Sequence, residues 1–146
     1  MRTINEKSCG AIIFKKFKKE WKVLLIKQIN KNWGFPKGHV ENGESEIQTA
    51  QREIWEEVQL DKIQFFIDYK YSNEYVLTNG NNKQVIYFLA QYSHNKQPKF
   101  QASELLKAKF ISISRALNLI KFKTVREILN NAYKDFINLK STNEVK

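Results

Sequence analysis

The sequence predicts an α/β protein in which helices cover both faces of a mixed β-sheet. Short apolar runs rich in branched residues lie on both sides of one helical segment, and the last third of the chain shows helical spacing. The order strands, helix, strands, helices is typical of a sheet between two helix layers. The chain has 146 residues, the usual size of one domain, so we expect residues 1–146 to form a single domain.

The N-terminal part of the chain is expected to form two strands and a loop. The runs CGAIIFKKF (9–17) and WKVLLIKQI (21–29) predict strands, and the charged residues 15–20 between them predict a hairpin turn. The segment KNWGFPKGHVENGES (31–45) holds three of the five glycines and one of the two prolines. We therefore expect a loop there.

A helix is expected directly after this loop. Ser45 followed by Gln48 forms a capping-box pattern, with Ser45 as the N-cap. The apolar residues that follow at helical spacing are Ile47, Ala50, Ile54 and Val58. This spacing gives the helix one apolar face.

The second half of the chain is expected to add strands and then helices. Residues 63–77 and 83–93 predict strands joined by the turn TNGNN (78–82), and residues 107–111 predict one more short strand. The segment SRALNLIKF (114–122) leads into a longer helix. Its apolar stripe, which we expect in the core, consists of Phe122, Val125, Leu129, Ala132, Tyr133 and Phe136.

Composition excludes several classes of protein, but it does not identify the binding partner. No apolar run reaches the roughly 18 residues of a membrane span, and the N-terminus has no apolar signal region, so we expect a cytoplasmic protein without membrane contact. Cys9 is the only cysteine, which excludes an internal disulfide and a cysteine-based zinc site. The net charge of +10 suits a polyanionic partner, but compositional drift explains it equally well, because 21 of the 25 basic residues are lysine.

Four glutamates gather on one flank of the expected helix. At about 100° per residue, they fall within a sector of about 100° beside the apolar face; they are Glu46, Glu53, Glu56 and Glu57. Half-buried carboxylates repel one another unless a cation lies between them. An all-oxygen cluster favours a hard cation such as Mg²⁺ or Mn²⁺. The alternative is a solvated acidic helix face.

The spacing around these glutamates resembles the signature of the Nudix hydrolases, Gly-x5-Glu-x7-Arg-Glu-U-x-Glu-Glu-x-Gly-U, where U is aliphatic. The matching residues are Gly38, Glu44, Arg52, Glu53, Ile54, Glu56, Glu57 and Leu60. Gln59 departs from the pattern, because the family has a glycine there that ends the helix in the left-handed conformation. The resemblance implies a Nudix-type α/β/α sandwich whose loop–helix–loop motif holds divalent cations against a diphosphate.

The resemblance also implies roles for individual residues. The implied metal ligands for Mg²⁺, with Mn²⁺ as an alternative, are Glu53, Glu56 and Glu57. The implied catalytic machinery consists of Glu53, Glu57, Arg52, Glu44 and Glu104. Arg52 is expected to hold a carboxylate in place, Glu44 to pair with Arg52, and Gly38 to let the loop approach the metal site closely. A left-handed Gln59 would cost roughly 1–2 kcal/mol, unless the helix ends differently.

Flanking segments from about residue 8 to residue 136 resemble one branch of this family, the asymmetric dinucleoside tetraphosphatases, which cleave diadenosine tetraphosphate. These segments include SCGAIIF, NWGFPKGHVENGE and KQVIYFLA. The likeness implies that Lys37 and Lys83 contact polyphosphate, and that Tyr87 and Phe122 hold the adenine ring. Each of these residues also has a structural interpretation, namely core packing for the aromatic rings and solvation for the lysines.

Two other functions remain open on the same motif: an RNA 5′-pyrophosphohydrolase, for which the basic surface is a mild argument, and a non-catalytic module that senses a nucleotide. The intact acidic triad argues against the second of these. We expect a monomer that binds a dinucleoside polyphosphate, with RNA as a further candidate partner.

Overall fold

The computed structural model describes residues 3–145, without the side chains of residues 143–145. Its elements in chain order are β1 (Glu6–Phe17), β2 (Glu20–Gln28), β3 (Trp33–Gly34), β4 (Lys37–His39), α1 (Glu46–Val58), β5 (Gln64–Val76), β6 (Asn82–Gln91), β7 (Leu105–Ser112), α2 (Ile113–Leu119) and α3 (Lys123–Val145). No helix within residues 3–145 combines the length and apolar character that crossing a membrane requires.

The strands form one mixed sheet, as the sequence predicted. The main order is β3-β2-β1-β6-β5, while β4 pairs with β1 and β7 pairs with β2. Strands β1 and β6 run parallel, with Glu6 opposite Lys83 and Phe14 opposite Gln91, whereas the other pairings are antiparallel. The parallel pair lies in the middle of the sheet, which explains its continuous apolar run.

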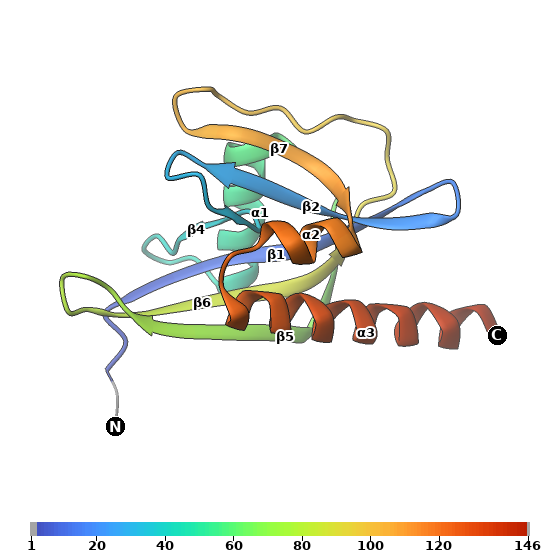
Figure 1. The fold of residues 1–146 in the computed structure, drawn as a ribbon. Helices are drawn as coiled ribbons and strands as arrows, with labels where there is room; N and C mark the ends of the chain where they lie inside the picture. The colour runs from blue at the N-terminus through green and yellow to red at the C-terminus, as the bar shows by residue number, and fades with distance from the viewer. Residues whose placement is uncertain (1–2, 146) are drawn as a thin grey trace.

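Helices cover both faces of the sheet (Figure 1), with α1 on one face and α2 and α3 on the other. Side chains alternate between the two faces along each strand. Thus Ile12 and Leu25 belong to the core under α2 and α3, while Ile13 and Leu24 belong to the core under α1. The sheet therefore separates two hydrophobic cores, and the predicted fold class is confirmed.

Three local expectations were wrong. The turn predicted over residues 15–20 consists only of Lys18 and Lys19, since Phe17 already pairs with Glu20. The strands extend through this charged segment because a projecting hairpin leaves lysine side chains free to reach water. The loop predicted over residues 31–45 contains the short strands β3 and β4. Finally, Phe122 precedes α3 and is 53% exposed, so it does not belong to the core.

Both ends of α1 are defined by specific contacts. The Ser45 side chain accepts a hydrogen bond from the Gln48 N–H, and the Gln48 side chain accepts one from the Ser45 N–H, which completes the predicted capping box. Gln59 ends the helix with φ 56° and ψ 37°, and its N–H donates to the Trp55 carbonyl. The helix thus ends as it would with glycine and accepts a strain of about 1–2 kcal/mol.

Candidate active site

Arg52 on α1 connects the preceding loop to the helix. Its Nε donates to Glu44 Oε2 at 2.6 Å and its Nη2 donates to Glu44 Oε1 at 3.0 Å. Nη2 also donates to the His39 carbonyl at 2.8 Å. The two parallel hydrogen bonds from Arg52 to Glu44 are the arrangement that a guanidinium typically makes with a carboxylate. The pairing of Glu44 with Arg52 that the sequence predicted is therefore present.

Glu44 is held by further hydrogen bonds from its own surroundings. Its Oε1 accepts the Glu41 N–H and the Thr49 hydroxyl, each at 2.9 Å. The hydrogen bonds from Arg52, followed by the one from the Glu41 backbone, lower the pKa of Glu44 to about 2. The carboxylate is thus ionised at neutral pH and fixes the loop against the start of α1.

Glu53, Glu56 and Glu57 form what we call the acidic flank of α1. Arg52 Nη1 donates to Glu53 Oε1 at 2.8 Å and to Glu56 Oε2 at 3.0 Å. The Glu53 side chain is 15% exposed and that of Glu56 is 53% exposed. Among the side chains of residues 3–142, no three histidine, cysteine, aspartate or glutamate residues stand together as a ready-made metal site. The flank is present, and Glu53 and Glu56 share Arg52 Nη1 as a hydrogen-bond donor.

Glu57 is the member of the acidic flank that contacts β4. Its Oε1 accepts the Lys37 N–H at 2.7 Å. Burial raises the pKa of Glu57 to about 7; the Lys37 hydrogen bond opposes that rise, and the charge of Glu53 adds to it. The charge of Glu104, an exposed residue just before β7, raises this pKa further. The structure therefore brings Glu104 to the Glu57 side of the flank.

Gly38 allows β4 to pass directly beside the acidic flank. It pairs with Cys9 in β1, whose side chain lies in the core next to α1. A Cβ atom at Gly38 would overlap the Glu53 carboxylate. Glycine is therefore needed here because of space and not because of backbone conformation, since its φ is not positive.

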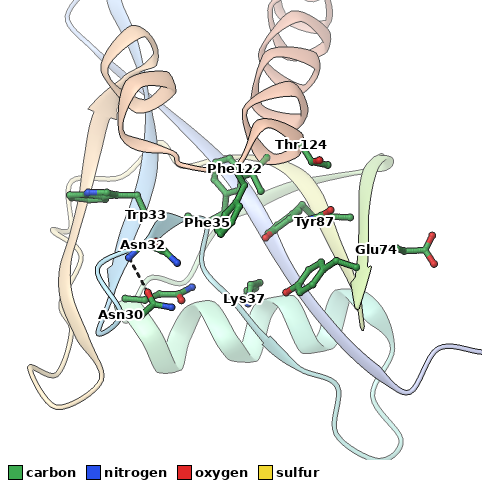
Figure 2. Close-up of a pocket in the computed structure, with 14 residues that line it drawn as sticks. Asn30, Asn32, Trp33, Phe35, Lys37, Glu74, Tyr87, Phe122 and Thr124 are labelled. Atoms are coloured by element: carbon green, nitrogen blue, oxygen red, sulfur yellow. Dashed lines mark hydrogen bonds between the residues drawn. The ribbon is translucent and has the colours of Figure 1, made fainter. Parts of the chain in front are cut away.

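A cavity of about 390 Å³ opens on the side of the sheet that carries α3, and the first turn of α3 adds Thr124 and Val125 to its lining (Figure 2). Its lining includes Tyr87 and Phe122, which the sequence predicted to act together, and Lys37. Tyr87 is only 3% exposed and packs edge-to-face on Phe35, with ring centroids 5.3 Å apart. Tyr87 thus forms part of the core as well as the cavity wall, whereas Phe122 offers an open aromatic ring.

The sequence interpretation missed Tyr75, which also lines this cavity and is 38% exposed. On β5, Tyr75 lies opposite Lys83 while Tyr71 lies opposite Tyr87. Residues four apart on a strand share a face. The predicted hairpin of these two strands could have identified Tyr75. Once β5 and β6 are paired, Tyr75 lies beside Lys83, the lysine that the resemblance assigned to polyphosphate.

Lys37 and Lys83 lie close to each other beside the cavity. Burial lowers the pKa of both side chains, and the charge of Lys83 lowers that of Lys37 further. Lys83 is 7% exposed, and its Nζ lies 3.4 Å from His39 Nε2. Two mutually repelling ammonium groups in a partly dry site favour an anion between them.

Comparisons with known proteins agree with this arrangement. The family model described as NUDIX domain matches residues 5–135. The asymmetrical bis(5′-nucleosyl)-tetraphosphatase of Sus scrofa is 31% identical over 137 residues, covering 87% of this chain and 92% of the relative. The crystal structure of a C. elegans Ap4A hydrolase binary complex has a TM-score of 0.83 at 26% identity, covering 91% of this chain and 98% of the other.

The chain therefore belongs to the Nudix family, and it is a Nudix hydrolase. Within that family it is similar to the asymmetrical bis(5′-nucleosyl)-tetraphosphatases, so the finer resemblance is also confirmed. The NUDIX domain of Shewanella oneidensis NrtR, complexed with ADP ribose, has a TM-score of 0.74 at 18% identity, which shows the shared fold alone.

Proposed function

We propose that this chain hydrolyses diadenosine tetraphosphate to ATP and AMP with the help of a divalent cation. The observation that carries the proposal is the position of Lys37. Its side chain lines the cavity, while its backbone N–H donates to Glu57 of the acidic flank. A nucleoside in the cavity would therefore have its phosphates at β4, the strand whose Lys37 N–H contacts the glutamates.

The acidic flank suits Mg²⁺ or Mn²⁺ through the chemistry of its donors. Glu53, Glu56 and Glu57 offer only carboxylate oxygens, and Gly38 leaves β4 without a side chain at Glu53. These glutamates would hold the cation, which supplies charge neutralisation at the phosphates and orientation of the attacking water. Arg52 would then keep Glu53 and Glu56 in position, and Glu44 would keep Arg52 in position.

Proton transfer from the water needs a carboxylate within hydrogen-bond reach. Such a base is typically worth about 10²–10⁴-fold in rate. Glu53 and Glu57 would be the candidates for this base, and Glu104, whose charge acts on Glu57, would be a third. Lys37 and Lys83 would bind the polyphosphate oxygens, which would relieve the repulsion between the two ammonium groups.

Adenosine would stack on the exposed rings of Phe122 and Tyr75, with Tyr87 closing the wall behind them. The cavity lies at a fixed position relative to the acidic flank, so one phosphorus of a symmetric substrate would face the water. Cleavage would then occur toward one end of the chain of four phosphates. The names of the similar proteins, Ap4A hydrolase and asymmetrical tetraphosphatase, support this choice of substrate and products.

The test is hydrolysis of diadenosine tetraphosphate with Mg²⁺ in ¹⁸O-labelled water, followed by mass spectrometry of the products. We expect ATP and AMP, with the label in AMP alone. Two molecules of ADP would contradict the proposed geometry. An inert dinucleoside substrate, together with pyrophosphate release from triphosphorylated RNA, would instead establish the RNA-processing function.

A further inference from the structure

The connection between β6 and β7 consists of residues 92–104 and passes the C-terminal end of α1 (Figure 1). We call it the β6–β7 loop. It ends at Glu104, the only member of the predicted catalytic set that lies outside the motif of residues 38–60. A long connection without its own helix or strand is mobile unless contacts hold it. The contacts of this loop therefore decide where Glu104 stands.

The Lys99 N–H fixes the loop to the last residue of α1. It donates to the Val58 carbonyl at 2.9 Å. The last four carbonyls of a helix have no donor within the helix, and Gln59 ends α1 in the left-handed conformation directly after Val58. The loop therefore supplies the donor that the helix itself lacks, and it does so one residue away from Glu57.

The Lys96 side chain makes a second contact with α1. Its Nζ lies 4.8 Å from the centroid of the Trp55 ring, which is 47% exposed. An ammonium at this distance is attracted by the indole ring. The two loop residues are three positions apart, as are the two helix residues that they contact, so the contacts follow the last turn of α1. Two separate contacts also prevent the loop from rotating about a single hydrogen bond.

A turn and a buried side chain hold Glu104 itself. The Glu104 N–H and the Leu105 N–H both donate to the Gln101 carbonyl, at 2.9 and 3.0 Å. Leu105 is 4% exposed and belongs to the same core as Val58. Glu104 thus lies between the contacts of the loop with α1 and a residue of the core under α1. The effect of its charge on the pKa of Glu57 agrees with this place beside the acidic flank.

We propose that the Lys99 N–H and the Lys96 ammonium position Glu104 at the acidic flank by holding the β6–β7 loop on the last turn of α1. Lys96 and Lys99 are then positioning residues, because neither lines the cavity. The inference rests on the proposed function, which assigns the cation to the acidic flank. Its consequence is that loss of one backbone N–H, with every glutamate intact, should lower the rate.

The kinetic test removes the Lys99 N–H. Lys99→Pro lacks this donor, whereas Lys99→Ala keeps it and removes only the side chain, which makes it the matched control. We expect kcat for diadenosine tetraphosphate to fall by about 10- to 100-fold in Lys99→Pro. The KM should be nearly unchanged, because none of residues 92–104 lines the cavity. Lys99→Ala should keep the wild-type kcat.

A double variant shows whether Lys99 acts through Glu104. Glu104→Gln alone should also lower kcat. The addition of Lys99→Pro should then cause no further loss, because both changes act through the same carboxylate. Independent effects would multiply instead. A merely structural role of the Lys99 N–H would lower the rate by the same factor in both backgrounds.

Two further measurements do not depend on turnover. Hydrogen exchange followed by NMR reports the Lys99 amide directly. Lys96→Met keeps the length of the side chain and removes its charge, so the protection of this amide should fall by about 2- to 5-fold. Lys134→Met, the same change at an exposed position of α3, should leave it unchanged. Titration with Mn²⁺ should show weaker binding for Glu104→Gln and Lys99→Pro than for wild type and Lys99→Ala.

The results distinguish this inference from the proposed function. If diadenosine tetraphosphate is not hydrolysed, but Mn²⁺ binding weakens in Glu104→Gln and Lys99→Pro and not in Lys99→Ala, the inference holds and the proposed function fails. If hydrolysis proceeds and either Lys99→Pro or Glu104→Gln keeps the wild-type kcat, or their losses multiply, the inference is overturned and the proposed function stands. Absence of hydrolysis together with unchanged Mn²⁺ binding overturns both. Where thermal melts show that Lys99→Pro does not fold, Lys96→Met decides, and unchanged protection of the Lys99 amide overturns the inference.

Discussion

Replacing Gly38 by alanine tests whether the position of Glu53 matters for catalysis. The added methyl group would occupy the space of the Glu53 carboxylate. The backbone itself accepts alanine, because Gly38 does not have a positive φ. The substitution therefore acts mainly on Glu53. Its Cδ lies 1.9 Å from the position of the added Cβ, so the carboxylate must move by roughly 1.5 Å to reach ordinary contact distance.

The expected magnitudes distinguish a catalytic effect from a loss of folding. A misplacement of about 1 Å can cost about 100-fold in rate, which corresponds to about 2.7 kcal/mol in the activation free energy. Loss of the hydrogen bond between Arg52 and Glu53 lowers the free energy of unfolding by about 1.5–3 kcal/mol. Alanine also makes the unfolded chain less flexible than glycine does, which raises the free energy of unfolding by about 0.4–1 kcal/mol. A net loss of about 1–2 kcal/mol lowers the melting temperature by about 3–8 °C and leaves nearly all of the protein folded.

The assay compares kcat and melting temperature for wild type, Gly38→Ala and Gly34→Ala. Gly34 lies in the same segment, has no positive φ, and a Cβ there would meet no atom within 4 Å. The kcat and the melting temperature of Gly34→Ala serve as the control. Its KM does not, because Gly34 lines the cavity and the added methyl group could affect substrate binding. A folded Gly38→Ala protein with the wild-type kcat would refute the placement of Glu53 in the catalytic site.

Three further predictions address other parts of the site. Glu57→Gln should nearly abolish turnover in a folded protein, because the amide keeps the shape but loses charge and metal affinity; full activity at saturating Mg²⁺ would remove Glu57 from the metal site. Tyr75→Ala and Phe122→Ala should each raise KM about 5- to 100-fold, as expected for a base–aromatic contact worth about 1–3 kcal/mol, and thermal melts should exclude unfolding as the cause. The pKa of Glu44 is lowered to about 2 from its usual value of 4.5, so its contribution to stability is complete above pH 4.5 and is lost as the pH falls toward 2. The difference in melting temperature between wild type and Glu44→Gln should therefore shrink between pH 5 and pH 2, and a constant difference would show that the charge of Glu44 does not stabilise the fold.

The sequence predicted most of the secondary structure because hydrophobic spacing reports burial. Ile54 and Val58 repeat at helical spacing and are fully buried under the sheet. The same signal failed at Phe122, which continues the apolar stripe of α3 but lies just before the helix and beside the cavity. Periodicity indicates which residues could share a face, but it does not indicate where the covering helix begins.

The candidate site was predictable where it depends on local spacing and unpredictable where it depends on strand pairing. Glu44 and Arg52 meet because the loop and helix are adjacent in sequence. The contact of Glu57 with the Lys37 N–H, and the approach of Tyr75 to Lys83, arise from strand partners that sequence spacing alone does not specify. Likewise, the edge-to-face contact of the buried Tyr87 comes from Phe35, which lies between β3 and β4.

The parallel pairing of β1 with β6 has a consequence for how the protein forms during synthesis. The hairpin of β1 and β2 involves neighbouring segments and can form early, but Glu6 must wait for Lys83 to leave the ribosome before the middle of the sheet can close. Helix α1 is made before that point, so its apolar face, including Ile54, lacks its complete sheet partner in the nascent chain. A chain that stops before β6 would carry every glutamate of the acidic flank on a helix whose apolar face is still partly uncovered.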